Sequence, residues 1–320
     1  MKQDGVFTAK LIACISQRTN PRDYLVKKLG ISSVSAYRRM RSEILFSFDE
    51  AVDIALEMGF SLDEITETSK YPFLSDPREN DSPYLENVFL EMLQEYNKYL
   101  KIIANASHKV IQASMSNLNF FLIAEHENLF KLFYFKWIYP FYNNMDSQFF
   151  SRMKLPGKIE IERQSILSGI QNYRSIDFII DENLFFSVIR EIRYFHHRKL
   201  ISGKEVEALK TNLSDLLNRM ENRMQGVPED SVQNFYLSLL SVESSSICAA
   251  YDQSVASLYW LPSGKAMIVQ KPEICYMHKR WLASQKKSAV LISGSNEMKR
   301  IEFIDQQRKY IESITDRLQY

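Results

Sequence analysis

Residues 21–41 of the chain read PRDYLVKKLGISSVSAYRRMR. A short segment with an apolar face runs into Gly30, and a serine-led segment with three arginines follows it. Glycine adopts positive φ without strain, so Gly30 suits the position just past the end of one helix. Ser32 or Ser33 can accept a backbone N–H and begin the next helix. Helix, glycine-containing turn and serine-capped helix together predict a helix-turn-helix.

The segments before and within this motif predict three helices. The spacing of apolar residues over 7–16 indicates a first helix. Pro21 suits the first turn of the second helix, where no intrahelical N–H is required. On the third helix we expect Ala36, Tyr37 and Met40 to face inward, which leaves the arginines for the outside or the flanks.

Two more helices are predicted directly behind the motif. Ser47 followed three residues later by Glu50 is typical of a capping box at a helix start. Gly59 marks the end of that fourth helix. A second pattern of serine followed by glutamate begins a short fifth helix over residues 61–65. Five short helices are thus expected within residues 1–70.

This layout resembles a known class of DNA-binding domain. Residues 35–43 read SAYRRMRSE, and GFSLDEI stands at residues 59–65. Both are similar to the XRE-like variant of the Cro/phage-repressor domain that heads two-part bacterial transcriptional regulators. The resemblance covers about a fifth of the chain. It implies a five-helix repressor-like fold in which helix three, about Ser32–Ser42, enters the major groove of double-stranded DNA.

One departure from the family pattern concerns the third helix. The commoner pattern has aliphatic residues six and nine positions after the turn glycine, where this chain has Ala36 and Arg39. We expect Met40 to supply the buried contact one residue later.

The resemblance implies DNA contacts from helix three and from the end of helix two. The expected contact residues are Ser33, Ser35, Arg38, Arg39, Arg41, Lys27 and Lys28. Residues 10–41 hold eight basic residues and one acid, whereas residues 42–69 hold eight acids and no Lys or Arg. A basic face of this kind is what phosphate contacts require.

A different class of function is compatible with the same residues. In this alternative the arginines pair with Glu43 or nearby aspartates. The charged residues then only cover the solvent-exposed faces of a helical bundle. The N-terminal bundle is then a protein-interaction module, and the chain is a scaffold that does not bind DNA.

A polar, proline-containing linker is predicted over residues 71–83. Behind it, apolar residues alternate at spacings of four and three from Leu85 to Ala113. This pattern predicts a long helix over residues 82–115 with a heptad seam. The seam can pair with the same helix of a second subunit, giving a homodimer suited to two-fold DNA sites, or it can pack within its own domain.

An aromatic-rich segment follows, with ten aromatic residues between Leu118 and Tyr142. We expect core here, with the lining of a ligand pocket and an interface as alternatives. Residues 175–180 are predicted as a short extended piece or a helix end. Helices over 184–200 and 204–224 complete a helical dimerisation or core region at residues 84–226.

The character of the chain then changes. Four short segments between residues 234 and 270 are rich in β-branched and aromatic residues, which is typical of strands. A helix over 272–285, a strand over 289–293 and a closing helix over 296–318 follow. Residues 227–320 therefore predict an α+β domain with a small antiparallel sheet, a possible sensor or effector domain. The expected fold class is mainly α.

Composition restricts the function classes. The net charge of the chain is +1, so any nucleic-acid affinity must come from a local patch. An odd number of cysteines without a CxxC pair argues against a disulfide framework or a zinc site: Cys14, Cys248 and Cys275. Neither a signal peptide nor a membrane span is expected. These features favour a cytoplasmic protein without membrane partners.

No constellation for catalysis is apparent. His196 and His197 are adjacent, and adjacent residues on a helix point about 100° apart, so they do not converge on a metal. We predict no catalytic residue, no metal site and no cofactor, and the chain is not expected to be an enzyme. An unidentified small-molecule or protein effector of the C-terminal domain is expected by analogy with two-part regulators.

Overall fold

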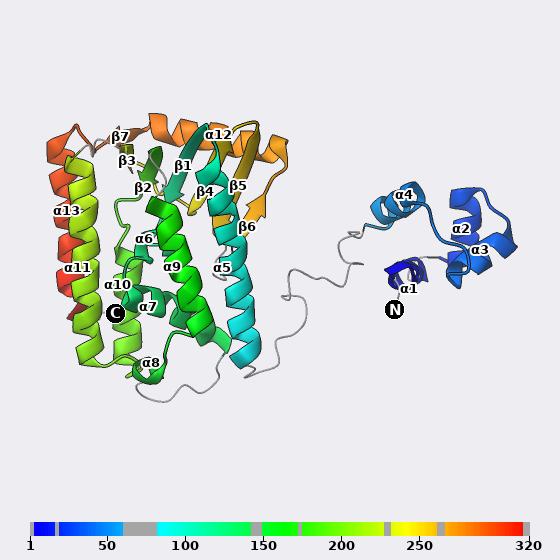
Figure 1. The fold of residues 1–320 in the computed structure, drawn as a ribbon, viewed down its shortest axis with the longest axis horizontal. Helices are drawn as coiled ribbons and strands as arrows, with labels where there is room; N and C mark the ends of the chain where they lie inside the picture. Colours follow the sequence, from blue (N-terminus) through cyan, green and yellow to red (C-terminus); the bar gives the residue numbers. More distant parts are fainter. Residues whose placement is uncertain are drawn as a thin grey trace. The chain divides into compact units, whose positions relative to one another are not determined.

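The computed structural model describes residues 3–16, 19–59, 82–141, 149–171, 175–226, 232–260 and 266–315. The chain divides into two compact units, residues 1–76 and residues 77–320, which we call the N-terminal and C-terminal units (Figure 1). Each unit has its own buried apolar core.

The described part of the N-terminal unit contains four helices, α1 (Gln3–Ser16), α2 (Pro21–Leu29), α3 (Ser33–Met40) and α4 (Phe48–Met58). Asn20 caps α2 by accepting the N–H of Arg22 at 3.0 Å, and Pro21 occupies the first helical position, as predicted. The capping box of α4 is also confirmed. Ser47 Oγ accepts the N–H of Glu50 at 3.2 Å, and the Glu50 carboxylate accepts the N–H of Ser47 at 2.7 Å.

The core of this unit is formed by buried residues of all four helices: Phe7, Leu11, Ile15, Leu25, Ala36, Ile54 and Met58. Ala36 is the buried residue of α3, and Met40 packs partly buried beside it. The prediction that Tyr37 faces inward is wrong, because Tyr37 is 54% exposed. One step along a helix turns a side chain by about 100°, away from the side of Ala36.

The C-terminal unit combines helices with a single sheet. Its elements are α5 (Ser82–Asn105), β1 (Lys109–Met115), α6 (Phe120–Ile123), α7 (Glu127–Ile138), η3 (Tyr139–Phe141), α8 (Phe149–Arg152), α9 (Gly157–Gln171), β2 (Ser175–Ile180), α10 (Phe186–His197), α11 (Gly203–Gln225), β3 (Val232–Ser238), β4 (Ser246–Tyr251), β5 (Ser254–Trp260), β6 (Ala266–Val269), α12 (Pro272–Lys287), β7 (Ala289–Leu291), α13 (Glu297–Glu312) and η4 (Ser313–Thr315).

The sheet has seven strands in the order β6-β5-β4-β1-β2-β3-β7. The pairs β1–β2 and β2–β3 are parallel, whereas β4, β5, β6 and β7 join antiparallel. Parallel neighbours require long crossover connections, and helices supply them between β1 and β2 and between β2 and β3. Antiparallel β4–β6 form a meander of short connections on the other side of β1.

The two faces of the sheet are covered differently. Phe178 and Ile180 belong to the large core with α5, α9, α10, α11 and α13. Ile179 between them points to the opposite face, as alternation along a strand requires. There it packs in a smaller cluster with Cys248 of β4 and Cys275 of α12. Figure 1 shows α12 lying across the strands.

The expected fold class is wrong. It combined a five-helix repressor-like domain, a long-helix middle region and a small antiparallel sheet confined to the C-terminal part. Instead, β1 and β2 from the middle region lie near the centre of a seven-stranded mixed sheet with a parallel core. In the N-terminal unit the described residues form α1–α4. The predicted fifth helix at 61–65, and the predicted linker up to residue 81, lie outside the described residues.

The long predicted helix over 82–115 is also corrected. Helix α5 ends at Asn105, and the last part of the apparent seam is strand β1. The seam residues Phe89 and Tyr96 are fully buried in the C-terminal unit. Helix α5 packs on α9, where the Asn97 side chain donates to the backbone oxygen of Glu162 at 3.0 Å. The seam therefore follows the alternative of packing within its own domain.

The aromatic-rich segment forms α6, α7 and η3. Phe130 and Phe135 are fully buried, and Phe135 packs edge-on against Phe195 of α10 at 4.8 Å between ring centroids. The prediction that this segment is core is confirmed for α7.

Candidate nucleic-acid interface

Helices α2 and α3 are joined by a turn of three residues. α2 ends at Leu29, and Gly30 follows with φ 63° and ψ 30°, in the left-handed region. A Cβ on Gly30 would meet no atom within 4 Å, so glycine is needed for its backbone conformation and not for space. The Ser32 hydroxyl then accepts the N–H of Ser35 at 3.2 Å and begins α3. The predicted helix, glycine turn and serine-capped helix are confirmed as local structure.

Helix α3 presents one face to solvent. The exposed side chains of α3 and of the residue after it are Ser33, Val34, Tyr37, Arg38 and Arg41, which we call the outer face of α3. Three- and four-residue spacings place them in one stripe, away from the buried Ala36. Val34 is 70% exposed although it is apolar. The outer face therefore offers hydroxyl, apolar, aromatic and cationic groups together.

The two exposed arginines share one carboxylate. The Nε atoms of Arg38 and Arg41 each lie 3.4 Å from a different oxygen of Glu43, and both side chains are more than half exposed. The Arg41 guanidinium also lies over the Tyr37 ring, 5.8 Å from its centroid. Exposed ion pairs at this distance are weak, so both guanidinium groups are available to exchange Glu43 for another anion.

Arg39 faces the opposite way. Its Nη1 donates to the Leu45 carbonyl at 3.3 Å and to the Glu50 carboxylate at 2.5 Å. The guanidinium lies over the Phe46 ring, 5.3 Å from its centroid, and the side chain is only 14% exposed. Arg39 is thus a link between α3 and α4, and it contributes no exposed charge comparable to that of Arg38.

The groups around Glu50 lower the pKa of its carboxyl group. Burial alone would raise the pKa of Glu50, but the N–H of Ser47 and the Arg39 guanidinium outweigh it and lower that pKa below its usual value. Arg39 and the capping box therefore stabilise the same carboxylate.

The two lysines at the end of α2 differ in their partners. Lys28 forms an ion pair with Glu57 of α4, and this hydrogen-bonded carboxylate raises the pKa of Lys28. Burial and the same Glu57 raise the pKa of Tyr24 to about 12. Lys27 is exposed and has no ion-pair partner among the residues described. Part of the acidic segment therefore neutralises α2 and α3 inside the unit.

The seven predicted contact residues thus divide into groups. Ser33, Arg38, Arg41 and Lys27 are exposed without a strong partner, Lys28 is exposed but paired, Ser35 is half-buried, and Arg39 faces inward. Sequence reasoning missed Val34 and Tyr37 as surface groups. The signal was present, because both share helical spacing with Arg38 and Arg41 once Ala36 is taken as the buried residue.

Other features of the chain bear on its class. No three His, Cys, Asp or Glu side chains lie close enough to hold a metal ion in the described part of the chain. None of the described helices is long and apolar enough to cross a membrane. Comparison with known proteins yields no relative: no protein-family model matches the chain, no curated protein is significantly similar to it, and no solved structure matches it.

Proposed function

We propose that the chain is a sequence-specific DNA-binding regulator of transcription that inserts α3 into the major groove of double-stranded DNA. The observation that carries this proposal is the outer face of α3, which follows the left-handed Gly30 turn and lies opposite the buried Ala36. An α-helix fits the major groove, where each base pair presents a distinct pattern of donors, acceptors and methyl groups. The proposal rests on this face and on the resemblance of the N-terminal sequence to repressor-type regulators.

Each group on the outer face has a chemical role in this proposal. Residues near the start of a recognition helix reach the base edges. Ser33 would hydrogen-bond there, and Val34 would contact thymine methyl groups. Arg38 and Arg41 would bind phosphates or guanine edges, and the exposed Tyr37 would contact a base edge. Lys27 would bind the phosphate backbone.

The remaining expectations follow from this role. Two copies of α3 held by a homodimer would contact two half-sites one helical turn apart. With a DNA-binding role, we also expect the protein to lie in the cytoplasm of a bacterial cell. An effector would act through the C-terminal unit.

Salt-dependent DNA affinity tests this proposal. The purified full chain would be used to select duplexes from a random pool, and its affinity for an enriched duplex would be measured over a range of salt concentrations. We expect log affinity to fall linearly with log salt, and the Arg38→Ala/Arg41→Ala variant to reduce the magnitude of the slope by about 1–2.

A matched control uses two exposed arginines of the C-terminal unit. The Arg190→Ala/Arg280→Ala variant removes the same charge but leaves α3 unchanged, so its slope should equal that of the wild type. No enriched duplex and no salt-dependent binding would overturn the proposal. That result would favour the protein-interaction module, for which exposed Val34 and Tyr37 are also suitable.

A further inference from the structure

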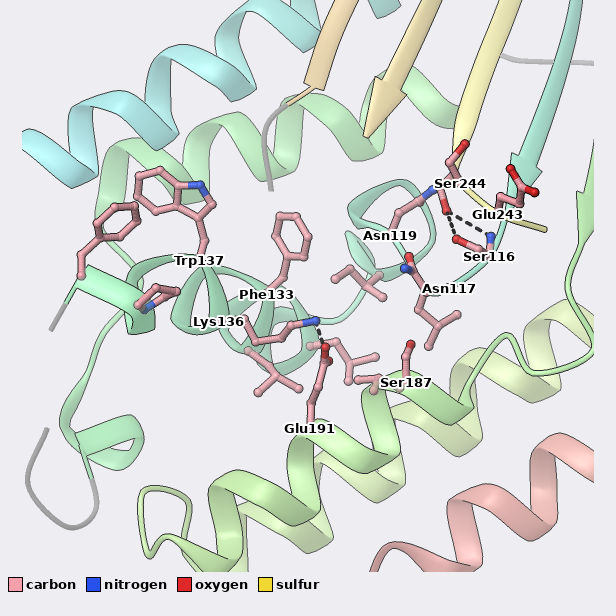
Figure 2. Close-up of a pocket in the computed structure, with 18 residues that line it drawn as sticks. Ser116, Asn117, Asn119, Phe133, Lys136, Trp137, Ser187, Glu191, Glu243 and Ser244 are labelled. Atoms are coloured by element: carbon pink, nitrogen blue, oxygen red, sulfur yellow. Dashed lines mark hydrogen bonds and ion pairs between the residues drawn. The ribbon is translucent and has the colours of Figure 1, made fainter. Parts of the chain in front are cut away.

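The C-terminal unit contains a cavity that the DNA-binding proposal does not use. Its volume is about 580 Å³, within the range of small-molecule sites. It is lined by the loop after β1 (residues 116–119), by α7, η3 and α10, and by the loop before β4 (residues 243–245) (Figure 2).

The position of the cavity in the sheet is typical of ligand sites. Strand β1 pairs with β2 on one side and with β4 on the other. From β1 the chain crosses over to β2 and then to β3, all on one side of β1. The next strand, β4, lies on the other side of β1. In α/β sheets, ligands bind outside the carboxyl ends of strands at the point where the connections diverge in this way. The loop after β1 and the loop before β4 meet at this point.

Hydrogen bonds hold the two loops together. The N–H of Ser116 donates to Ser245 Oγ at 3.1 Å, and the two hydroxyl groups lie 3.2 Å apart. Asp181, at the end of β2, accepts the N–H of Val242 at 2.8 Å. The end of the cavity formed by these two loops is polar, and hydrogen bonds hold the loops in a defined position.

Hydrogen-bonding groups remain free at this end. The Asn117 amide and the Ser187 hydroxyl line the cavity, and neither has a hydrogen-bond partner among the described residues. Figure 2 shows Ser187 pointing from α10 toward the cavity. A hydroxyl and an amide offer both donors and acceptors to an uncharged ligand.

The opposite end of the cavity is aromatic. Phe133, Trp137 and Phe141 line it. Trp137 packs against Phe141 at 5.7 Å between ring centroids and against the buried Phe89 at 5.3 Å. These two ring contacts restrain the indole, which lines the cavity together with Phe133. Aromatic side chains of this kind favour contact with a planar ring.

The charges of the lining select against anions. Lys136 of α7 and Glu191 of α10 form an ion pair at 2.5 Å, so the charge of this lysine is neutralised within the lining. The other charged residue among the described lining residues is Glu243, which is exposed and acidic. Among the described residues of this lining, a phosphate or carboxylate group would find no free cation, and phosphate sites normally supply one.

We propose that this cavity binds an uncharged, ring-bearing small molecule with several hydroxyl or amide groups, of the nucleoside class. The planar base lies against Trp137 and Phe133, and the sugar hydroxyls face Asn117 and Ser187. The cavity lies within the C-terminal unit alone, so this proposal does not depend on whether α3 binds DNA.

Calorimetry of the full chain with adenosine, guanosine, cytidine, uridine and thymidine tests this assignment. Each nucleoside is compared with its 5′-monophosphate. We expect at least one nucleoside to bind, at least tenfold more tightly than its monophosphate. Failure of all five nucleosides to bind, or equal binding of nucleoside and monophosphate, would overturn the proposal.

Two variants locate the binding. Ser187→Phe fills the cavity from α10 and should weaken binding at least a hundredfold, while Asn117→Ala should weaken it about tenfold. Ser284→Phe places the same bulk on an exposed position of α12 and should leave binding unchanged. Thermal unfolding of each variant reports its folding. Nucleoside binding that persists in folded Ser187→Phe would exclude this cavity.

Discussion

Arg39 and Glu50 form an ion pair, with 2.5 Å between Nη1 and Oε2, that joins the last turn of α3 to the first turn of α4. The same Glu50 carboxylate accepts the N–H of Ser47 in the capping box. One carboxylate thus orients the arginine of one helix and begins the next. The outer face of α3 depends on this inner connection, because it sets how the end of α3 sits on the core.

Arg39→Ala should destabilise the N-terminal unit. The substitution leaves the half-buried Glu50 without its charged partner, and hydrogen bonds to charged groups contribute about 1.5–3 kcal/mol. We expect faster hydrogen exchange of the backbone amides in α3 and α4 of the full chain. Arg38→Ala is the matched control, since Arg38 is exposed and its pair with Glu43 is weak. Equal exchange rates in both variants would contradict an inward role for Arg39.

Gly30→Ala should also destabilise this unit, by about 1–2 kcal/mol, because φ at Gly30 is 63° and L-residues are strained there. No atom lies near the added Cβ, so the cost comes from the backbone alone. Gly30→Asn should cost less, since Asn tolerates the left-handed region. Chemical denaturation, monitored by hydrogen exchange of the backbone amides in α2 and α3, measures the loss of stability in both variants. A larger cost for Asn than for Ala would point to steric crowding.

Tyr37→Ala and Lys27→Ala should affect DNA binding differently if α3 enters the major groove. Loss of a base contact changes preference at one or two base pairs, by about 1–3 kcal/mol, whereas loss of a phosphate contact weakens binding to all duplexes alike. Selection of random duplexes by each variant gives the comparison. An unchanged motif with Tyr37→Ala, or an altered motif with Lys27→Ala, would reassign these two residues.

His278 should make stability depend on pH. It is 6% exposed between Ser246 and Ser257, with contacts of 2.9 and 2.8 Å, and burial lowers its pKa to about 4. The unfolded chain takes up this proton below pH 6.5, but the folded chain does so only near pH 4. The contribution of neutral His278 to the free energy of unfolding is therefore complete above pH 6.5. About 3 kcal/mol of it is lost as the pH falls from 6.5 toward 4.

His278→Gln cannot titrate, so its free energy of unfolding should fall less between pH 6.5 and pH 4 than that of the wild type. Urea unfolding at several pH values measures the difference. His197→Gln, at an exposed position, is the control and should follow the wild type. Parallel pH profiles for wild type and His278→Gln would show that this imidazole is not buried in its neutral form.

Asp181→Asn should loosen the loop before β4. One Asp181 oxygen accepts the N–H of Val242 at 2.8 Å, and the other accepts the N–H of Asn183 at 2.8 Å. An amide has only one oxygen, so one of these N–H groups would face a donor, at a cost of about 1–3 kcal/mol. We expect faster hydrogen exchange at Val242 or Asn183, and weaker ligand binding if the loop lining is disturbed. Asp252→Asn, in the turn between β4 and β5, is the control. Asp252 accepts one N–H, from His108 at 3.1 Å, which the single amide oxygen of asparagine can still accept, so exchange at Val242 and Asn183 should stay unchanged.

The candidate interface was partly predictable. Gly30, Ser32 and the capping box of Ser47 and Glu50 act over three or four residues, so the ends of α2, α3 and α4 follow from local chemistry. The roles of the arginines were not predictable in the same way. Arg38 and Arg39 are adjacent and chemically identical, and only the packing of α3 on α4 makes one of them an exposed cation and the other an internal link.

The cavity and the sheet required more than local pattern. Residues 175–180 read SIDFII, and a run this short fits a strand or a helix end equally well. Their pairing with β1 and β3 joins segments that lie more than 50 residues apart in the chain.

Capping groups within one helical turn therefore settle where α2, α3 and α4 begin and where α2 and α4 end. Which strands pair, which arginine faces solvent, and where Trp137 and Ser187 meet around a cavity depend on contacts between distant segments. Those contacts are chosen by the burial of one shared core, and no window of neighbouring residues contains that information.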